Sequence, residues 1–124
     1  MKWIILAVLL ALSVTTATAK EWGIDMSSTT RDLLYAYDTI FDQKQRQVIE
    51  ALIGGMQDGL GWANAELFHR GQPVLYCQPD KLAITHHQMV DMVRREKKEK
   101  PGLGDLPLGG VVLHALQDTF PCKE

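Results

Sequence analysis

The chain has two cysteines, Cys77 and Cys122, so an intramolecular disulfide has one connectivity open to it. The bond would close a loop of about 45 residues, for which the chain-entropy model gives a stabilisation of about 4 kcal/mol. A metal site is the weaker alternative, because neither cysteine has a partner ligand at zinc-finger spacing. We therefore predict a Cys77–Cys122 disulfide, on the condition that the chain folds in an oxidising compartment.

The N-terminus meets that condition, because it has the three parts of a secretory signal peptide. Met1 and Lys2 give a positive start, residues 3–12 are uninterruptedly apolar, and residues 17–19 (Ala-Thr-Ala) have the small-x-small pattern of a cleavage site. A membrane anchor is the alternative, but this apolar stretch would span only about half of a bilayer's hydrocarbon core. We predict cleavage after Ala19 and a periplasmic location.

The predicted mature chain, residues 20–124, has about 105 residues, a typical size for a single domain. Without Lys2, 12 of the 13 basic residues remain against 15 acidic ones, which gives a net charge of −3. There is no long tract of one charge sign, so nothing recommends nucleic acid as a partner. We predict one domain that has no membrane contact once the signal peptide is removed.

Four segments of this domain have apolar residues at helical spacing. The first is a helix of about ten residues capped by the hydroxyls at 29–30, with an apolar face of Leu33, Leu34, Tyr37 and Phe41. The others cover residues 42–68, 85–100 and 107–120; Thr85 and Gln88 form a capping box for the third, and prolines bound the last two. No segment alternates convincingly like a strand. The predicted fold is all-α, a compact bundle of four or five helices closed by one disulfide.

The second predicted helix combines an apolar stripe with four glycines. The stripe consists of Val48, Ile49, Leu52, Ile53, Met56, Leu60, Ala63 and Leu67, and the glycines are Gly54, Gly55, Gly59 and Gly61. Each glycine costs about 1 kcal/mol relative to alanine in a helix interior. Gly55 and Gly59 share a face that would let another backbone pack closely. Tight packing in the core is the first interpretation, and a kink or a homodimer contact is the alternative.

The residue types needed for catalysis do not gather in the sequence. His86 and His87 are adjacent, so on a helix they point about 100° apart and cannot hold one metal ion from a single face; His69 and His114 lie elsewhere. No serine lies in a nucleophile-elbow pattern, and no glycine-rich phosphate loop is present. We expect no catalytic residue, no metal and no cofactor, and therefore a function in binding.

A run of positive charge ends the third predicted helix and leads into a glycine-flanked loop. The run consists of Arg94, Arg95, Lys97, Lys98 and Lys100, and the loop contains Leu103 and Asp105. Positive charge at a helix C-terminus is favoured by the helix dipole, which is the first interpretation. The alternative is a surface for an acidic partner, with residues 94–106 as the contact region and Leu103 as an apolar tip.

An order of landmarks in the second half carries a family resemblance. It runs Tyr76-Cys77-Gln78-Pro79, then the helix led by Thr85, then Ala115-Leu116 and a terminal Phe120-Pro121-Cys122. Residues 55–58 (Gly-Met-Gln-Asp) match a glycine-then-acid segment. Over residues 52–122 the chain resembles the Rap/Tai family of immunity proteins, which protect bacteria against peptidoglycan amidases delivered by type VI secretion. It departs from the family in lacking a cysteine in the first helix and in its glycine-rich loop at 102–104.

The resemblance implies a periplasmic immunity protein that binds a cognate amidase effector and occludes its catalytic cleft. Members of the family are often dimeric, which implies Gly55 and Gly59 as a self-contact. A different class of function remains open, since small exported helical proteins with one disulfide also include periplasmic chaperones and stress proteins without a dedicated toxin partner.

Overall fold

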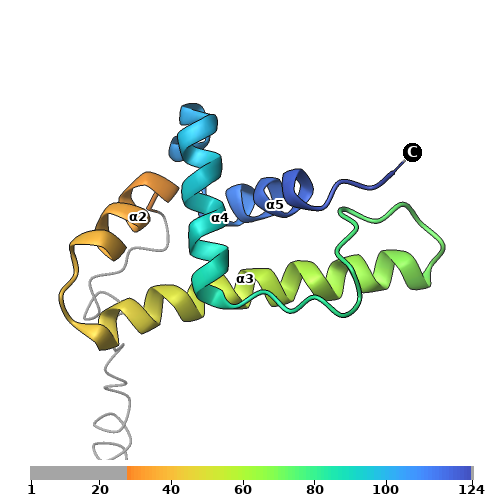
Figure 1. The fold of residues 1–124 in the computed structure, drawn as a ribbon, viewed down its shortest axis with the longest axis horizontal. Coiled ribbons are helices and arrows are strands. Elements are labelled where there is room, and N and C mark those ends of the chain that lie inside the picture. Colours follow the sequence, from red (N-terminus) through yellow and green to blue (C-terminus); the bar gives the residue numbers. More distant parts are fainter. Residues whose placement is uncertain (1–27, 124) are drawn as a thin grey trace, which may run out of the picture.

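A computed structural model of the protein describes residues 28–123, and the predicted signal peptide lies outside them. The elements run α2 (Thr30–Thr39), α3 (Gln43–His69), α4 (His86–Glu99), the 3₁₀-helix η2 (Pro101–Asp105) and α5 (Leu108–Thr119) (Figure 1). Within residues 28–123 the only β-type pairing is an isolated bridge between Thr29 and Pro107. The predicted all-α fold is confirmed. None of these helices has the length and hydropathy needed to cross a membrane.

The core lies where α4 and α5 meet the first half of α3. Helix α4 rises from the middle of α3, and α5 lies beside α4 and above α3 (Figure 1). Seven side chains of α4 and α5 are completely buried: Met89, Val90, Val93, Val111, Val112, Ala115 and Leu116. Helix α3 adds Ile49 and Ile53, and α2 covers one side with Leu33, Leu34 and Tyr37.

Helix α2 begins at the predicted cap and ends earlier than its apolar pattern suggests. Thr29 and Asp32 form a capping box, and the buried Thr30 donates from its backbone N and its hydroxyl to the Leu106 carbonyl, at 3.0 and 2.8 Å. The helix stops at Thr39, before the predicted face is complete. Phe41 is therefore fully exposed in the connection to α3, and its assignment to the buried face of the first helix was wrong.

Helix α3 is one continuous helix, and most of the predicted apolar stripe lies on its buried face. Ile49, Ile53, Met56, Leu60 and Leu67 are buried or partly buried, as predicted. The prediction that Val48 and Ala63 are buried was wrong, because both side chains are exposed.

The glycines of α3 differ in what surrounds them. Gly54 lies against the side chain of His86, at the start of α4. A Cβ at this position would lie 2.3 Å from His86 Nε2. Gly55 and Gly59 are exposed, and a Cβ at either would meet no atom within 4 Å. Core packing at Gly55 and Gly59 was therefore the wrong interpretation, and their role in a dimer stays a prediction.

Helices α4 and α5 follow their sequence signals closely. The Thr85–Gln88 capping box is present, with the Thr85 backbone N donating to Gln88 Oε1 at 2.8 Å and the Gln88 backbone N donating to Thr85 Oγ1 at 3.2 Å. Lys100 is the C-cap of α4, Pro101 begins η2, and Pro107 is the N-cap of α5.

The long connection between α3 and α4 is fastened to the bundle at residues 75–77. The Cys77–Cys122 disulfide is present with a Cα–Cα distance of 4.9 Å, and the Cys77 backbone N donates to the Phe120 carbonyl at 2.8 Å. From α3, the Asn64 side chain accepts from the Leu75 backbone N at 2.6 Å and donates to the Tyr76 carbonyl at 2.9 Å. The connection therefore lies along the C-terminal half of α3 in a fixed register.

Candidate binding surface

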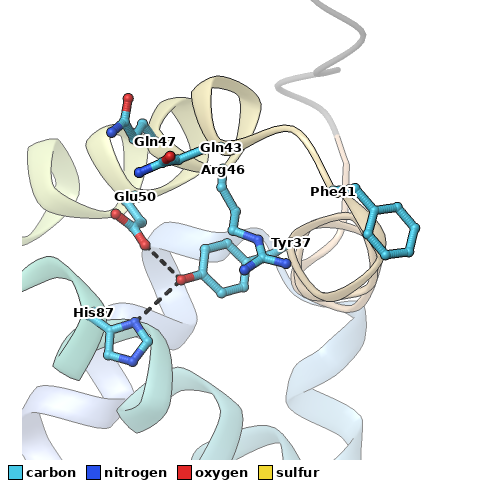
Figure 2. A pocket seen from close by; sticks show the side chains of 7 residues that line it. All are labelled: Tyr37, Phe41, Gln43, Arg46, Gln47, Glu50 and His87. Carbon is cyan, nitrogen blue, oxygen red and sulfur yellow. Dashed lines mark hydrogen bonds between the residues drawn. The ribbon is translucent and has the colours of Figure 1, made fainter.

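An open cleft of about 460 Å³ lies where α2, α3 and α4 come together. Figure 2 shows its lining: Tyr37, Phe41, Gln43, Arg46, Gln47, Glu50 and His87. Four of these residues come from the first two turns of α3, whose polar side chains face away from the core. The cleft therefore combines charged and amide groups with the exposed ring of Phe41.

Tyr37 lies at the centre of this cleft and connects the three helices. Its hydroxyl donates to Glu50 Oε1 at 2.6 Å and lies 3.3 Å from His87 Nδ1. The Arg46 guanidinium lies over the Tyr37 ring, 5.5 Å from the ring centre (Figure 2). Desolvation by burial, and then the hydrogen bond to Glu50, raise the pKa of Tyr37 above its usual 10.0. The hydroxyl is therefore a protonated donor at neutral pH.

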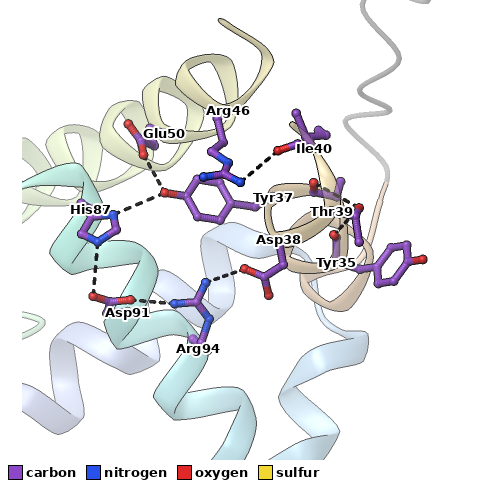
Figure 3. A network of polar contacts seen from close by, with 11 residues as sticks. Tyr35, Tyr37, Asp38, Thr39, Ile40, Arg46, Glu50, His87, Asp91 and Arg94 are labelled. Atoms are coloured by element: carbon purple, nitrogen blue, oxygen red, sulfur yellow. Dashed lines mark hydrogen bonds and ion pairs between the residues drawn. The ribbon is translucent and has the colours of Figure 1, made fainter. Parts of the chain in front are cut away.

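The contacts of Tyr37 continue into a chain of polar groups (Figure 3). His87 Nε2 lies 3.8 Å from Asp91, Asp91 pairs with Arg94 at 2.7 Å, and Arg94 pairs with Asp38 of α2 at 2.7 Å. These side chains are 41–67% exposed, so each pair contributes little to stability by itself. Their joint effect is to hold the charged rim of the cleft in one arrangement.

The chemistry offered by this cleft is hydrogen bonding and charge pairing. The chain from Glu50 through Tyr37 to His87 could move a proton, but no serine or cysteine belongs to it, and both cysteines are in the disulfide. Among residues 28–123 there is no group of three or more His, Cys, Asp or Glu side chains that could hold a metal ion. The geometry fits recognition of another molecule's surface.

The four histidines do not converge. His86 packs on Gly54, and His87 belongs to the polar chain around Tyr37. His69 lies at the end of α3 and His114 on the exposed side of α5.

The predicted basic contact region is largely tied into the fold. Arg94 pairs with Asp38 and Asp91, Arg95 donates to Thr119 Oγ1 at 2.8 Å, and Lys100 pairs with Asp118 and with the buried Glu96. Lys98 is exposed and Lys97 is partly buried. This end of α4 is thus less available as a cationic surface than the sequence suggests.

The loop after α4 also differs from the protruding tip that was expected. Residues 101–105 form η2, Asp105 pairs with Arg31 of α2 at 3.1 Å, and Leu103 packs against the core. The interpretation of Leu103 as an exposed apolar tip was wrong, because the buried Gly104 lets η2 pack closely on Arg31 and Lys97.

Large exposed apolar side chains lie instead on α2, on α3 and between them. Phe41 is 100%, Trp62 78%, Phe68 77% and Tyr35 71% exposed. Aromatic side chains are enriched at protein–protein interfaces. Phe41 was predicted to be buried, and no surface role was predicted for the other three side chains. For Trp62 a signal exists: it shares the face of Gly55 and Gly59, opposite Ile53 and Leu60.

A second pocket, of about 390 Å³, lies against the C-terminal half of α3. It is lined by Gln57, Asp58, Gly61, Trp62, Ala65, Tyr76 and Gln78. Its position depends on the contacts of Asn64 with residues 75–76, so the fastened connection between α3 and α4 forms one wall.

Comparison with known proteins gives one match. No curated protein and no solved structure matches the chain. The family model of the Rap1a immunity proteins matches residues 29–122, from the N-cap of α2 to the second cysteine of the disulfide. The chain belongs to the Rap1a immunity protein family.

Proposed function

We propose that this protein is a periplasmic immunity protein that binds a peptidoglycan amidase effector of a type VI secretion system and occludes its catalytic cleft. The observation that carries the proposal is the family match over residues 29–122, which spans nearly all of the described domain. Family membership indicates an immunity protein for a secreted effector, and so a cognate partner. The assignment of a peptidoglycan amidase as the effector rests on the resemblance of residues 52–122 to Rap/Tai proteins.

The surface supports a function in binding a protein. Tight interfaces use a few aromatic or arginine anchors surrounded by polar contacts that exclude water. The cleft around Tyr37 has this composition, with Phe41 beside Arg46, Glu50 and His87. Occlusion needs no catalytic group of its own, because blocking access to the effector's nucleophile is enough.

The contact region predicted around residues 94–106 remains part of the proposal in a narrower form. Since Arg94, Lys100 and Asp105 are paired within the fold, Lys98 is an exposed basic residue of this region that takes part in none of the ion pairs among residues 28–123. Gly55 and Gly59 remain the proposed contact of a homodimer, because both lie on open surface of α3.

Co-expression tests the proposal directly. The full chain is produced together with a periplasm-directed Cys-His amidase encoded beside its gene, and lysis is followed by culture turbidity. We expect protection by the full chain, no protection by a variant without residues 2–19, and a stable complex on gel filtration. Unabated lysis with the full chain would exclude the immunity function. Broad suppression of aggregation at low pH, without amidase binding, would instead indicate the chaperone alternative.

A further inference from the structure

The second pocket has a chemical character that differs from the cleft around Tyr37. It lies beside the C-terminal half of α3, where the connection to α4 runs back along the helix (Figure 1). Asp58 and Trp62 are four residues apart and therefore share one face of α3. Tyr76 and Gln78 come from the fastened connection, on either side of Cys77.

The two glutamine side chains in this pocket use their NH₂ groups within the fold, so that their oxygen atoms remain as acceptors for a ligand. Gln57 Nε2 donates to the Ile84 carbonyl at 3.0 Å, and Gln78 Nε2 donates to the Leu82 carbonyl at 2.5 Å. Gln57 Oε1 is buried and has no hydrogen-bond partner within residues 28–123. A buried acceptor without a donor costs free energy, and a ligand that donates an N–H group to it would relieve that cost.

The charge in this pocket is negative and unpaired. None of the ion pairs among residues 28–123 includes Asp58, so its carboxylate has no cationic partner there. Trp62 lies next to it with its indole 78% exposed. The face of an indole ring attracts cations, and it does so best for a flat guanidinium that can also stack.

We propose that this pocket receives a cationic side chain, preferably an arginine, from the protein partner. Asp58 pairs with the charge, Trp62 stacks on the guanidinium plane, and Gln57 Oε1 or Gln78 Oε1 accepts from its N–H groups. The partner that carries this arginine is the amidase effector, an assignment that rests on the proposed function. The pocket would supply a specificity contact, since an effector without a cation at this point would leave Asp58 and Gln57 unsatisfied.

A small probe tests the pocket without the effector. The probe is N-acetyl-arginine amide, and its uncharged isostere N-acetyl-citrulline amide is the control. Binding is followed by the fluorescence of Trp62 in a mature chain that carries Trp22→Phe. We expect weak, salt-sensitive binding of the arginine compound and at least a fivefold preference over the citrulline compound. Equal binding of the two compounds, or no binding of either, would overturn the inference.

Matched variants locate the binding. Asp58→Asn should weaken probe binding about two- to fivefold, the range expected for one exposed charge contact. Glu99→Gln makes the same change in net charge at the exposed end of α4 and should leave binding unchanged. If the two variants weaken binding equally, the effect is general electrostatics and the pocket is not the site. Circular dichroism confirms that both variants fold.

Binding to the amidase effector itself is the last test of the pocket. Asp58→Asn should lower the affinity for the amidase at least tenfold, as expected for an anchor contact. Asp80→Asn makes the same change in net charge at an exposed residue that lines neither pocket, and it should leave that affinity unchanged. If Asp58→Asn still protects against lysis and binds the amidase with unchanged affinity, the immunity function is supported and the pocket is not a contact for the effector. If the protein binds the arginine probe but does not bind the amidase, the pocket does recognise a guanidinium group. In that case the amidase is not its partner, and the proposed immunity function is excluded.

Discussion

At Gly54 the side chain of His86, the first residue of α4, lies against the backbone of α3. A Cβ at this position would lie 2.3–2.6 Å from three ring atoms of His86, which is inside van der Waals contact. His86 is exposed, so its ring can rotate away, but it then leaves the surface of α3 on which it packs. The glycine thus permits the first residue of α4 to rest directly on the backbone of α3.

We therefore predict that Gly54→Ala and Gly55→Ala have different effects, although the two glycines are neighbours. At a protein concentration where the chain is monomeric, Gly55→Ala should stabilise the protein by about 1 kcal/mol, because the added methyl group meets no other atom of the chain and helix propensity improves. Gly54→Ala should be at least about 1 kcal/mol less favourable, because the His86 ring must move. Urea unfolding at one protein concentration measures both.

A double-mutant cycle assigns the cause of that difference. In a His86→Ala background the clash is absent, so Gly54→Ala should approach the stability gain of Gly55→Ala. If the gap between the two substitutions is the same in both backgrounds, His86 does not cause it.

At the scale of elements, the connection between α3 and α4 is held to the bundle by a few polar contacts. Asn64 makes two contacts within 3 Å and a third, longer one from the Tyr76 backbone N at 3.4 Å. From the other side, Gln117 of α5 donates to the Leu75 carbonyl at 3.3 Å. These bonds satisfy backbone groups of a segment that has no secondary structure of its own.

Asn64→Ala should destabilise the protein by about 1–3 kcal/mol, because it leaves partly buried backbone groups without partners. Gln117→Ala, which removes one long hydrogen bond to the same segment, is the matched control and should cost about 1 kcal/mol or less. Thermal unfolding followed by circular dichroism measures both. Equal losses would show that Asn64 is not the principal fastening.

The disulfide fastens the same connection at its next residue, and its removal should act locally first. Cys77→Ala with Cys122→Ala should lower the free energy of unfolding by about 4 kcal/mol, the loop-closure value for the 45-residue separation. Hydrogen exchange of the buried Ile53 amide should accelerate only by the loss of global stability, whereas the amide of residue 77, which donates to the Phe120 carbonyl, should accelerate further because the connection can then also open locally. Uniform acceleration across both would contradict a local role for the bond.

The sequence was informative about elements where local chemistry decides their limits. The Thr29 and Thr85 caps, Pro101 and Pro107 bound helices in the structure as predicted, because capping and proline geometry act within one turn. The exposure of Val48 and Ala63 was missed, since helical periodicity does not show how wide the covered face of α3 is or how far along the helix it extends. The contact of Tyr37 with Glu50 and His87 was missed because it depends on how three helices cross.

At the scale of the whole molecule, the polar contacts that join the helices share a response to alkaline pH. Desolvation by burial raises the pKa of Tyr76 and, together with Glu50, that of Tyr37. The hydrogen bond from Lys100 to Asp118, which joins α4 to α5, raises the pKa of Lys100. In each case the folded protein holds its proton more tightly than the unfolded chain, whose values are near 10.0 for tyrosine and 10.5 for lysine.

The sign of the resulting pH dependence is therefore fixed. Stability from these groups is complete below about pH 10 and is lost as the pH rises through the folded-state pKa values. The urea midpoint should be flat from pH 8 to 9.5 and fall steeply above it. Tyr37→Phe removes one of the three groups and should make the fall shallower, whereas Tyr35→Phe, at a side chain 71% exposed, should leave it unchanged. An alkaline slope that Tyr37→Phe does not alter would mean that the contact between α2, α3 and α4 does not depend on the protonated hydroxyl.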